Sequence, residues 1–436
     1  MLRWRIAILI SVAIAISYLD RQAFPNAFNA ISRDIPFSKT DKALLDSAFL
    51  ITYGLMYIGG GKLMDRLGTR RGFLIVMIFW SIACMSHGIA GGFGMLAISR
   101  LMLGIGEGGG FPAATRAVAE WFPVRERSTA MGIMNAGTAV GAVVAAPLIL
   151  ILILPNVHWL GISSWRWVFF ITGSFGLIWT VWWVMDYYRP EQHASLSSAE
   201  RAVIASVLDS PAKPAELKIP ITRLLAFRQT WALMLAKFLT DAAWYFYLFW
   251  LPIYMQDARG FDYKSTGSVT WIPPAASGIG CLCGGMLSSW LITRGNSVNL
   301  SRKVALGASA ACMPFVALVP FVSVPWVIAI FSLAYFGQQS WSTLVMILPT
   351  DLFPKRAVGT VAGFVGFGGA MGGVSLGQLA GYLLDRHYSY IPIMAIAGSL
   401  HVIAFIVIML FVRRLDPLPV DTVESHPGEL LRSALG

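Results

Sequence analysis

Apolar residues occur in stretches of about 20 along nearly the whole chain, and short polar segments separate them. A helix of about 20 apolar residues crosses about 30 Å of hydrocarbon with its backbone hydrogen bonds satisfied internally. The pattern therefore predicts an all-α integral membrane protein with twelve transmembrane helices. We expect them near residues 5–30, 43–61, 72–91, 93–117, 128–153, 165–186, 229–255, 267–292, 303–322, 325–347, 359–383 and 391–412.

The longest polar segment, residues 187–228, is rich in proline and divides these stretches into two sets of six. We therefore expect an N-terminal six-helix bundle over residues 1–186, a cytoplasmic linker over 187–228, a C-terminal six-helix bundle over 229–413 and a cytoplasmic tail over 414–436. Ser197 or Ser198 before Glu200 forms a capping-box pattern, so part of the linker should be helical.

The two halves resemble each other in sequence. WFPVRERSTAMGIMNAGTAVGAVV, from Trp121, aligns with LFPKRAVGTVAGFVGFGGAMGGVS, from Leu352, and the alignment matches Gly141 to Gly372. Glycines at these intervals suit close helix packing, which could by itself explain them. Their recurrence in both halves predicts two pseudo-symmetric bundles.

The net charge of +11 does not indicate nucleic-acid binding, because the basic residues cluster in alternate loops. Cytoplasmic loops of membrane proteins carry an excess of Lys and Arg. Most of the basic residues face the cytoplasm if both termini lie there, so we expect cytoplasmic termini in a multi-pass protein of the cell (inner) membrane. The first apolar stretch is too long for a cleavable signal and is expected to remain as a helix.

Four ionisable residues interrupt two of the predicted spans: Asp20 and Arg21 in the first, Arg100 and Glu107 in the fourth. Each costs about 2.5–3.5 kcal/mol at the centre of a membrane helix, so such residues usually have a function. Helix geometry places Arg100 and Glu107 on almost one face, and Asp20, Arg21 and Arg100 at one depth. The alternative is a structural ion-pair network that joins the two helices.

These four residues suggest a mechanism for carrying an anion. A guanidinium group matches a carboxylate with two parallel hydrogen bonds, so Arg21 and Arg100 are candidate substrate ligands. A substrate that occupies an arginine removes the charge that compensates a buried carboxylate, and this favours protonation of Asp20 or Glu107.

Other polar and aromatic residues in the spans are candidates for binding sugar hydroxyls and ring faces. They are Tyr18, Tyr53, Asn135, Thr138, Trp244, Tyr245, Gln338, Gln339 and Trp341. Helix packing or an interfacial belt explains any one of the aromatic residues equally well. Lys237 and Asp241, four residues apart, either pair with each other or bind substrate.

The chain lacks a nucleotide-binding loop, a metal-ligand cluster and a nucleophile-base motif. We therefore expect neither an enzyme nor an ATP-driven pump, no cofactor or metal, and an ion gradient as the energy source. The four cysteines and the lone residues His87 and His401 are interpreted as packing residues.

The segment GKLMDRLGTRR, from Gly61 to Arg71, resembles the signature of the major facilitator superfamily between its second and third helices. In that family the loop helps to hold the two halves together in the outward-open state. The resemblance implies a gating role for Asp65, Arg66 and Arg70, although the arginines could also serve only to fix orientation.

A narrower resemblance is to the anion:cation symporters, in particular bacterial hexuronate transporters. It rests on YLDRQ from Tyr18, RLMLGIGEGGGFPA from Arg100, KFLTDAAWYFYLFWLPIYM from Lys237 and FPKRAVG from Phe353. It implies proton-coupled import of a hexuronate or related sugar acid by alternating access, with Asp20 and Glu107 coupling protons and Arg21 and Arg100 binding the carboxylate. The expected partners are a small organic anion, protons and the lipid bilayer, for a protein that acts as a monomer. The alternative is an uncoupled facilitator or channel for a polar solute.

Overall fold

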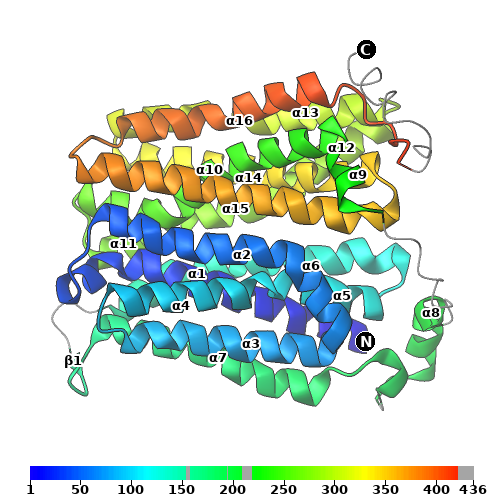
Figure 1. The fold of residues 1–436 in the computed structure, drawn as a ribbon, viewed down its shortest axis with the longest axis horizontal. Helices are drawn as coiled ribbons and strands as arrows, with labels where there is room; N and C mark the ends of the chain where they lie inside the picture. Colours follow the sequence, from blue (N-terminus) through cyan, green and yellow to red (C-terminus); the bar gives the residue numbers. More distant parts are fainter. Residues whose placement is uncertain (154–157, 194, 209–218, 421–436) are drawn as a thin grey trace.

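The computed structural model is a bundle of long helices that run side by side (Figure 1). It describes residues 1–153, 158–193, 195–208 and 219–420. The first half contains α1 (Leu2–Asp34), α2 (Lys39–Leu67), α3 (Thr69–Ser86), η1 (His87–Ile89), α4 (Phe93–Gly108), α5 (Gly110–Trp121), α6 (Val124–Leu152) and α7 (Ser164–Asp186). The predicted linker contains η2 (Pro190–Gln192), α8 (Ser198–Leu208) and α9 (Ile221–Leu225). The second half contains α10 (Arg228–Asp257), α11 (Tyr263–Val269), α12 (Ile272–Thr293), α13 (Val298–Ala311), η3 (Pro314–Phe321), α14 (Val324–Leu352), α15 (Lys355–Asp385) and α16 (Ile391–Phe411).

Nine helical segments in the described part of the chain are long and apolar enough to cross a membrane, and each coincides with a predicted span. The other three predicted spans fall in α4 with α5, which have only 16 and 12 residues, in α10 and in α14, and these helices do not meet the criterion of length and hydropathy. These are the helices that carry Arg100 and Glu107, Lys237 and Asp241, and Gln338. The full set of twelve crossings stays a prediction, and each helix that falls short of the criterion carries candidate functional residues.

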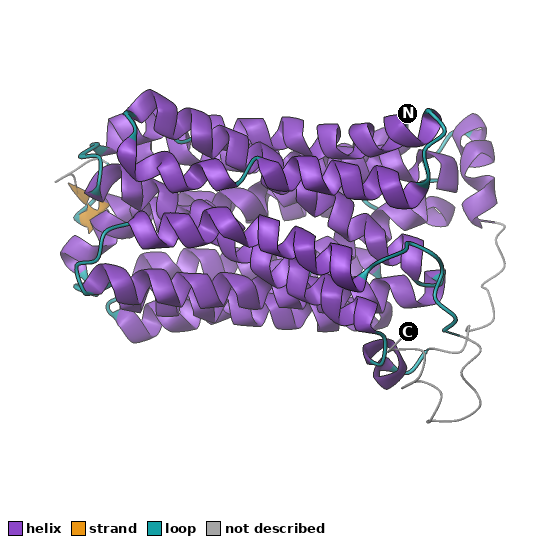
Figure 2. Cartoon of the chain, turned by 90° about the horizontal axis from the view of Figure 1, so that it is seen from above, coloured by secondary structure: helices purple, strands orange, loops and turns teal. Residues whose placement is uncertain are grey.

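A short antiparallel ribbon adds strand to the expected all-α fold, and it is the orange element at one end of the molecule (Figure 2). Its strands are β1 (His158–Trp159) and β2 (Ile162–Ser163). Leu160 and Gly161 connect them with φ of 54° and 77°, and a two-residue hairpin turn with both residues in this region matches the twist of paired strands. In the hydropathy pattern this segment is only a break between two predicted spans.

Matched glycines in the two halves make matching contacts. A Cβ at Gly141 of α6 would lie 2.2 Å from the carbonyl oxygen of Ala15 in α1, and one at Gly372 of α15 would lie 1.8 Å from that of Phe238 in α10. Neither distance is possible for a real side chain, so both positions need glycine for helix backbones to touch. Close packing therefore accounts for this glycine pair in the sequence repeat.

The halves meet mainly where α2 packs along α15 and where α6 packs against α11 and α12. At the predicted outer end, the Asp385 carboxylate of α15 accepts hydrogen bonds from the backbone amides of Lys39 and Thr40, at 2.8 and 2.7 Å. These amides begin α2, where free N–H groups and the helix dipole favour an anion. The Lys39 ammonium also pairs with Asp257 of α10. We call Lys39, Asp257 and Asp385 the outer latch.

At the other end of the bundle, α8 packs on the beginning of α1. The Glu200 carboxylate accepts hydrogen bonds from the backbone amides of Leu2 and Arg3, at 2.9 and 3.0 Å, and from the Arg3 guanidinium at 3.0 Å. Ser197 caps α8 by accepting from the Glu200 amide at 3.2 Å. Glu200 therefore caps a different helix from the one that contains it. Burial raises the pKa of its carboxyl, but the hydrogen bonds from Arg3 and Leu2 outweigh burial and leave that pKa below its usual value.

Candidate functional site

The centre of the candidate site is an ion pair between α1 and α4. The Arg21 guanidinium donates to Glu107 Oε2 through Nε at 3.1 Å and Nη2 at 2.8 Å, and Ser17 donates its hydroxyl to the same oxygen at 2.9 Å. Both charged side chains are at most 2% exposed. The second oxygen, Oε1, is buried and has no hydrogen-bond partner among the described residues.

Aromatic rings surround the Arg21 guanidinium. Its carbon lies 4.5 Å from the ring centroid of Tyr53, 4.8 Å from that of Tyr18 and 5.4 Å from that of Phe49. Tyr53 and Tyr57, both in α2, share a hydrogen bond of 3.2 Å between their hydroxyls. Two of the predicted ligands, Tyr18 and Tyr53, therefore lie directly beside the predicted carboxylate clamp. Cation–π attraction holds the guanidinium while hydroxyls remain nearby for a polar ligand.

Arg100, the second predicted clamp, is buried without a hydrogen bond at Nε or Nη2 within the described chain. Its guanidinium stacks over Phe24 at 4.0 Å from the ring centroid. Its charged neighbours are Asp46 of α2 and, second, Glu107. A buried guanidinium with free donors costs free energy, and a carboxylate ligand would repair that deficit.

Asp20 does not join this group, although the sequence suggested that Asp20, Arg21 and Arg100 meet. Its buried carboxylate faces Trp80 and Cys84 of α3 and Thr172 of α7, and neither oxygen has a hydrogen-bond partner within the described chain. The reason is helix geometry, because successive residues point about 100° apart and Arg21 already faces α4. Asp20 therefore lies against α3 and α7 without contacting either arginine, and Glu107 is the charged group that acts on it electrostatically.

A second polar cluster lies in the other half. The Lys237 ammonium donates to Asp241 at 2.9 Å and to the Ser342 hydroxyl at 2.8 Å. Gln338 donates its amide to Asp241 at 3.2 Å and is also hydrogen-bonded to His401. All but Ser342 are buried, so α10, α14 and α16 are joined by one polar network. Of the two sequence alternatives for Lys237 and Asp241, the structure shows the pair.

The remaining predicted ligands are distributed over three helices. Trp244 and Tyr245 are buried in α10, and Trp244 packs edge-on against Tyr335 at 5.0 Å between ring centroids. Trp341 of α14 lies inside its own half against His401, at 5.7 Å. Among the described residues, the structure records no side-chain contact between a charged group and Asn135, Thr138 or Gln339. Thr138 donates to its own helix, to the Asn135 carbonyl at 2.7 Å.

The predicted gating residues make their contacts within the first half. Asp65 pairs with Arg116 of α5 at 2.7 Å. Arg70 donates to the Val184 carbonyl at 2.8 Å and stacks over Tyr188 at 3.7 Å from its centroid. Arg66 is exposed at the end of α2. The prediction that these residues help to hold the two halves together concerns the outward-open state, and it stays a prediction.

Sequence reasoning missed three groups in this region. Ser17 lies one turn before Arg21, and a serine in an apolar span gives no distinctive signal in the sequence. Lys42 and Asp46 lie near the start of α2, where the predicted span begins at residue 43, and both are almost fully buried. The spacing of four residues between opposite charges was a signal that could have identified them.

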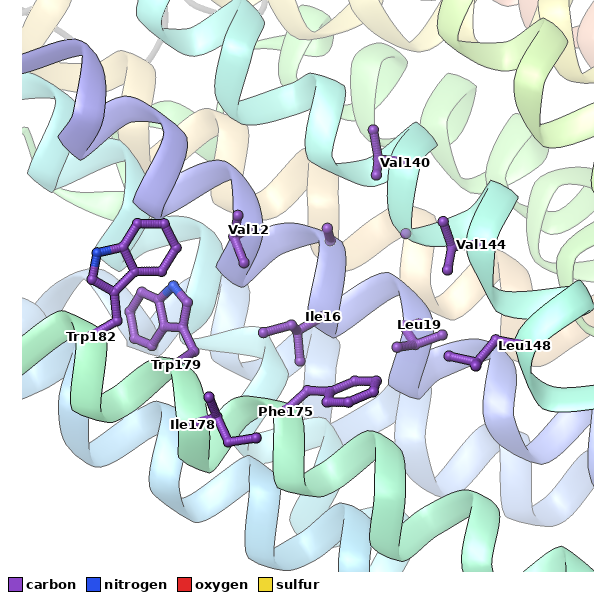
Figure 3. Close-up of a pocket in the computed structure, with 12 residues that line it drawn as sticks. Val12, Ile16, Leu19, Val140, Val144, Leu148, Phe175, Ile178, Trp179 and Trp182 are labelled. Atoms are coloured by element: carbon purple, nitrogen blue, oxygen red, sulfur yellow. The ribbon is translucent and has the colours of Figure 1, made fainter. Parts of the chain in front are cut away.

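The charged site is distinct from the pocket shown in Figure 3, which has a volume of about 460 Å³. Apolar residues of α1, α6 and α7 line it, among them Ile16, Val144 and Phe175. Because this lining is apolar, the pocket suits hydrocarbon and not a small anion.

Comparisons with known proteins agree with this architecture. The family model described as Major Facilitator Superfamily matches residues 10–377. A hexuronate transporter of Escherichia coli (strain K12) is 28% identical over 411 residues, which cover 93% of each chain. A galacturonate transporter of Dickeya chrysanthemi is 31% identical over 315 residues, 72% of this chain and 89% of the relative. The crystal structure of a D-xylose-proton symporter aligns with a TM-score of 0.72 at 14% identity, over 94% of this chain and 98% of that chain, which shows the shared fold. The chain therefore belongs to the Major Facilitator Superfamily, and it is a membrane transporter and not an enzyme.

Proposed function

We propose that the protein is a proton-coupled symporter of a small organic anion, a hexuronate or related sugar acid, and that it works by alternating access. The observation that carries the proposal is the buried pair of Arg21 and Glu107, whose guanidinium is ringed by aromatic side chains. Relatives named as hexuronate and galacturonate transporters support the class of substrate.

The pair provides a reason for coupling. In the empty carrier, Glu107 neutralises Arg21, and separating the two without replacement would leave a buried charge, at a cost of about 3–5 kcal/mol. A substrate carboxylate that takes the Arg21 donors displaces Glu107, and a carboxylate without its cation in a dry site favours protonation. Binding of anion and binding of proton therefore favour each other, as symport requires.

Asp20 is the second candidate proton carrier, because its buried carboxylate lies apart from both arginines. Arg100 supplies free donors to the substrate, and Tyr18, Tyr53 and Tyr245 supply hydroxyls. The gating role falls to Asp65, Arg66 and Arg70, which help to hold the two halves together in the outward-open state. The proton gradient is the energy source, without a cofactor, and the carrier works as a monomer with twelve crossings and both termini cytoplasmic in the inner membrane.

The test is uptake of labelled galacturonate, glucuronate, galactonate and galactarate into proteoliposomes. Arg21→Ala should abolish binding and uptake, and Arg21→Lys should restore little, because an ammonium group cannot offer two parallel hydrogen bonds. Uptake at the parental rate in Arg21→Ala would refute the carboxylate clamp. Equal rates in both directions that ignore a pH gradient would support the uncoupled facilitator instead.

A further inference from the structure

A buried cluster of three charges lies at the predicted outer side of the Arg21 pair, and the proposed function assigns only one of its members. The cluster consists of Arg100 of α4 with Lys42 and Asp46 of α2. The Lys42 ammonium pairs with Asp46 Oδ2, and its side chain is 0% exposed, against 5% for Asp46. Asp46 Oδ1 is buried and has no hydrogen-bond partner among the described residues.

Helix packing brings Asp46 beside Arg100. A Cβ at Gly104 would lie 2.3 Å from the carbonyl oxygen of Phe49, and one at Gly108 would lie 2.9 Å from that of Tyr53, so α2 and α4 run parallel in close contact. One turn back along each helix are Arg100 and the turn that holds Asp46. Arg100 thus has free donors at Nε and Nη2, and the adjacent carboxylate has a free acceptor.

The charges of this cluster do not balance. Asp46 is one anion beside two cations, Arg100 and Lys42, and Glu107, the other carboxylate near Arg100, is already bound by Arg21. The single Asp46 carboxylate therefore compensates two cations, and its Oδ2 atom pairs with the Lys42 ammonium. An arriving anion would complete the neutralisation of the cluster.

We propose that Asp46 is a positioning residue for substrate binding: its charge compensates that of Arg100 across the α2–α4 contact while the carrier is empty, without a direct ion pair, and the substrate carboxylate takes over this compensation. This inference rests on the proposed function and names a residue that sets its affinity. Because a competing internal anion weakens substrate binding, it also allows the substrate to leave. After the substrate leaves, Asp46 again compensates the charge of Arg100 and stabilises the empty carrier during its reorientation.

The cluster also reaches the other half of the protein. The Lys42 ammonium lies 4.2 Å from the ring centroid of Trp250 in α10. When the substrate carboxylate compensates Arg100, the charge of Asp46 acts on Lys42 alone, and Lys42 stays buried against Trp250. Substrate binding and closure of the outer side are thereby linked through one carboxylate.

The test uses the full chain in proteoliposomes with labelled galacturonate as the probe. Asp46→Asn should lower the half-saturating concentration for counterflow by roughly tenfold, within the range of ordinary coupling between sites. Net proton-driven uptake should slow by a similar factor, because the empty carrier has lost its counter-ion. Asp416→Asn, an exposed aspartate beyond α16, is the matched control and should leave both quantities unchanged.

The double variant Lys42→Gln with Asp46→Asn removes both members of the α2 pair and avoids an unpaired buried lysine. The inference predicts that its half-saturating concentration stays low. A return to the parental value would show that Asp46 only neutralises Lys42 and would overturn the inference, as would an unchanged or raised value in Asp46→Asn. A parental protein that binds none of the organic anions would instead refute the proposed function itself.

Discussion

Replacement of Glu107 by glutamine tests the coupling mechanism at its central residue. The side chain keeps its shape and one acceptor oxygen, so Ser17 and Arg21 can still donate to it, but it cannot carry a charge or release a proton. The variant therefore mimics a carrier that is permanently protonated at this position.

The magnitude follows from the two hydrogen bonds of 2.8 and 3.1 Å that Arg21 donates. Bonds to a charged acceptor are worth about 1.5–3 kcal/mol and bonds to a neutral one about 0.5–1.5, so the change loses about 1 kcal/mol for each bond and about 2 kcal/mol in total. A bound substrate restores the missing charge. Substrate should therefore bind Glu107→Gln more tightly by about 2 kcal/mol, or roughly 30-fold in Kd.

Counterflow and proton-driven uptake measured in the same proteoliposomes separate binding from coupling. Counterflow should persist, because exchange returns a loaded carrier and needs no deprotonation, whereas uphill accumulation should fail. Asp20→Asn should behave in the same way if two protons are coupled. A Glu107→Gln carrier that still concentrates substrate, or one that binds it more weakly, would remove Glu107 from the mechanism.

Three further predictions follow from the fold. Gly372→Ala should destabilise the protein by about 1–3 kcal/mol through overpacking, whereas Gly377→Ala, which has open space around it, should be neutral or slightly stabilising in thermal unfolding. Asp385→Asn should weaken the outer latch and raise the labelling rate of a cysteine introduced on the predicted outer face, because the first turn of α2 loses an anionic cap. Glu200→Gln should release α8 from α1, seen as faster hydrogen exchange in both helices, and the same loss should occur in the parental protein at acid pH. The sign follows from the pKa of the Glu200 carboxyl, which is lower in the folded protein than in an unfolded chain. The stabilisation is complete when the pH is above the unfolded pKa of about 4.3, and it disappears as the pH falls through the lower pKa of the folded protein.

Each of these predictions has an outcome that contradicts it. Equal melting temperatures for the two glycine variants would show that α10 and α15 can move apart with little loss of stability. Unchanged labelling in Asp385→Asn would mean that other contacts close the outer face. If hydrogen-exchange rates in α8 do not rise in acid, the packing of α8 on α1 does not depend on the ionisation of Glu200.

The sequence predicted the helices well because membrane spans have a strong signal in hydropathy. Nine predicted spans coincide with segments that meet a length and hydropathy criterion in the described chain. The β1–β2 ribbon was missed because its turn at Leu160 lacks the usual residues, such as Asn-Gly, that favour positive φ.

The site was predicted less completely, because its geometry depends on side-chain directions between helices. Arg21, Glu107, Tyr18 and Tyr53 do lie together. The position of Asp20 against α3 and α7 depends on which helix packs on which face of α1, and a single sequence does not contain that information.

The central claim is that proton and sugar acid move together, and the most direct test is to measure proton movement while substrate enters. Proteoliposomes with a pH-sensitive dye inside, and equal pH on both sides, would receive external galacturonate. The account predicts that the lumen acidifies as galacturonate enters, and that Glu107→Gln shows label exchange without acidification. Entry of galacturonate through the parental protein with no change in lumen pH would contradict proton symport.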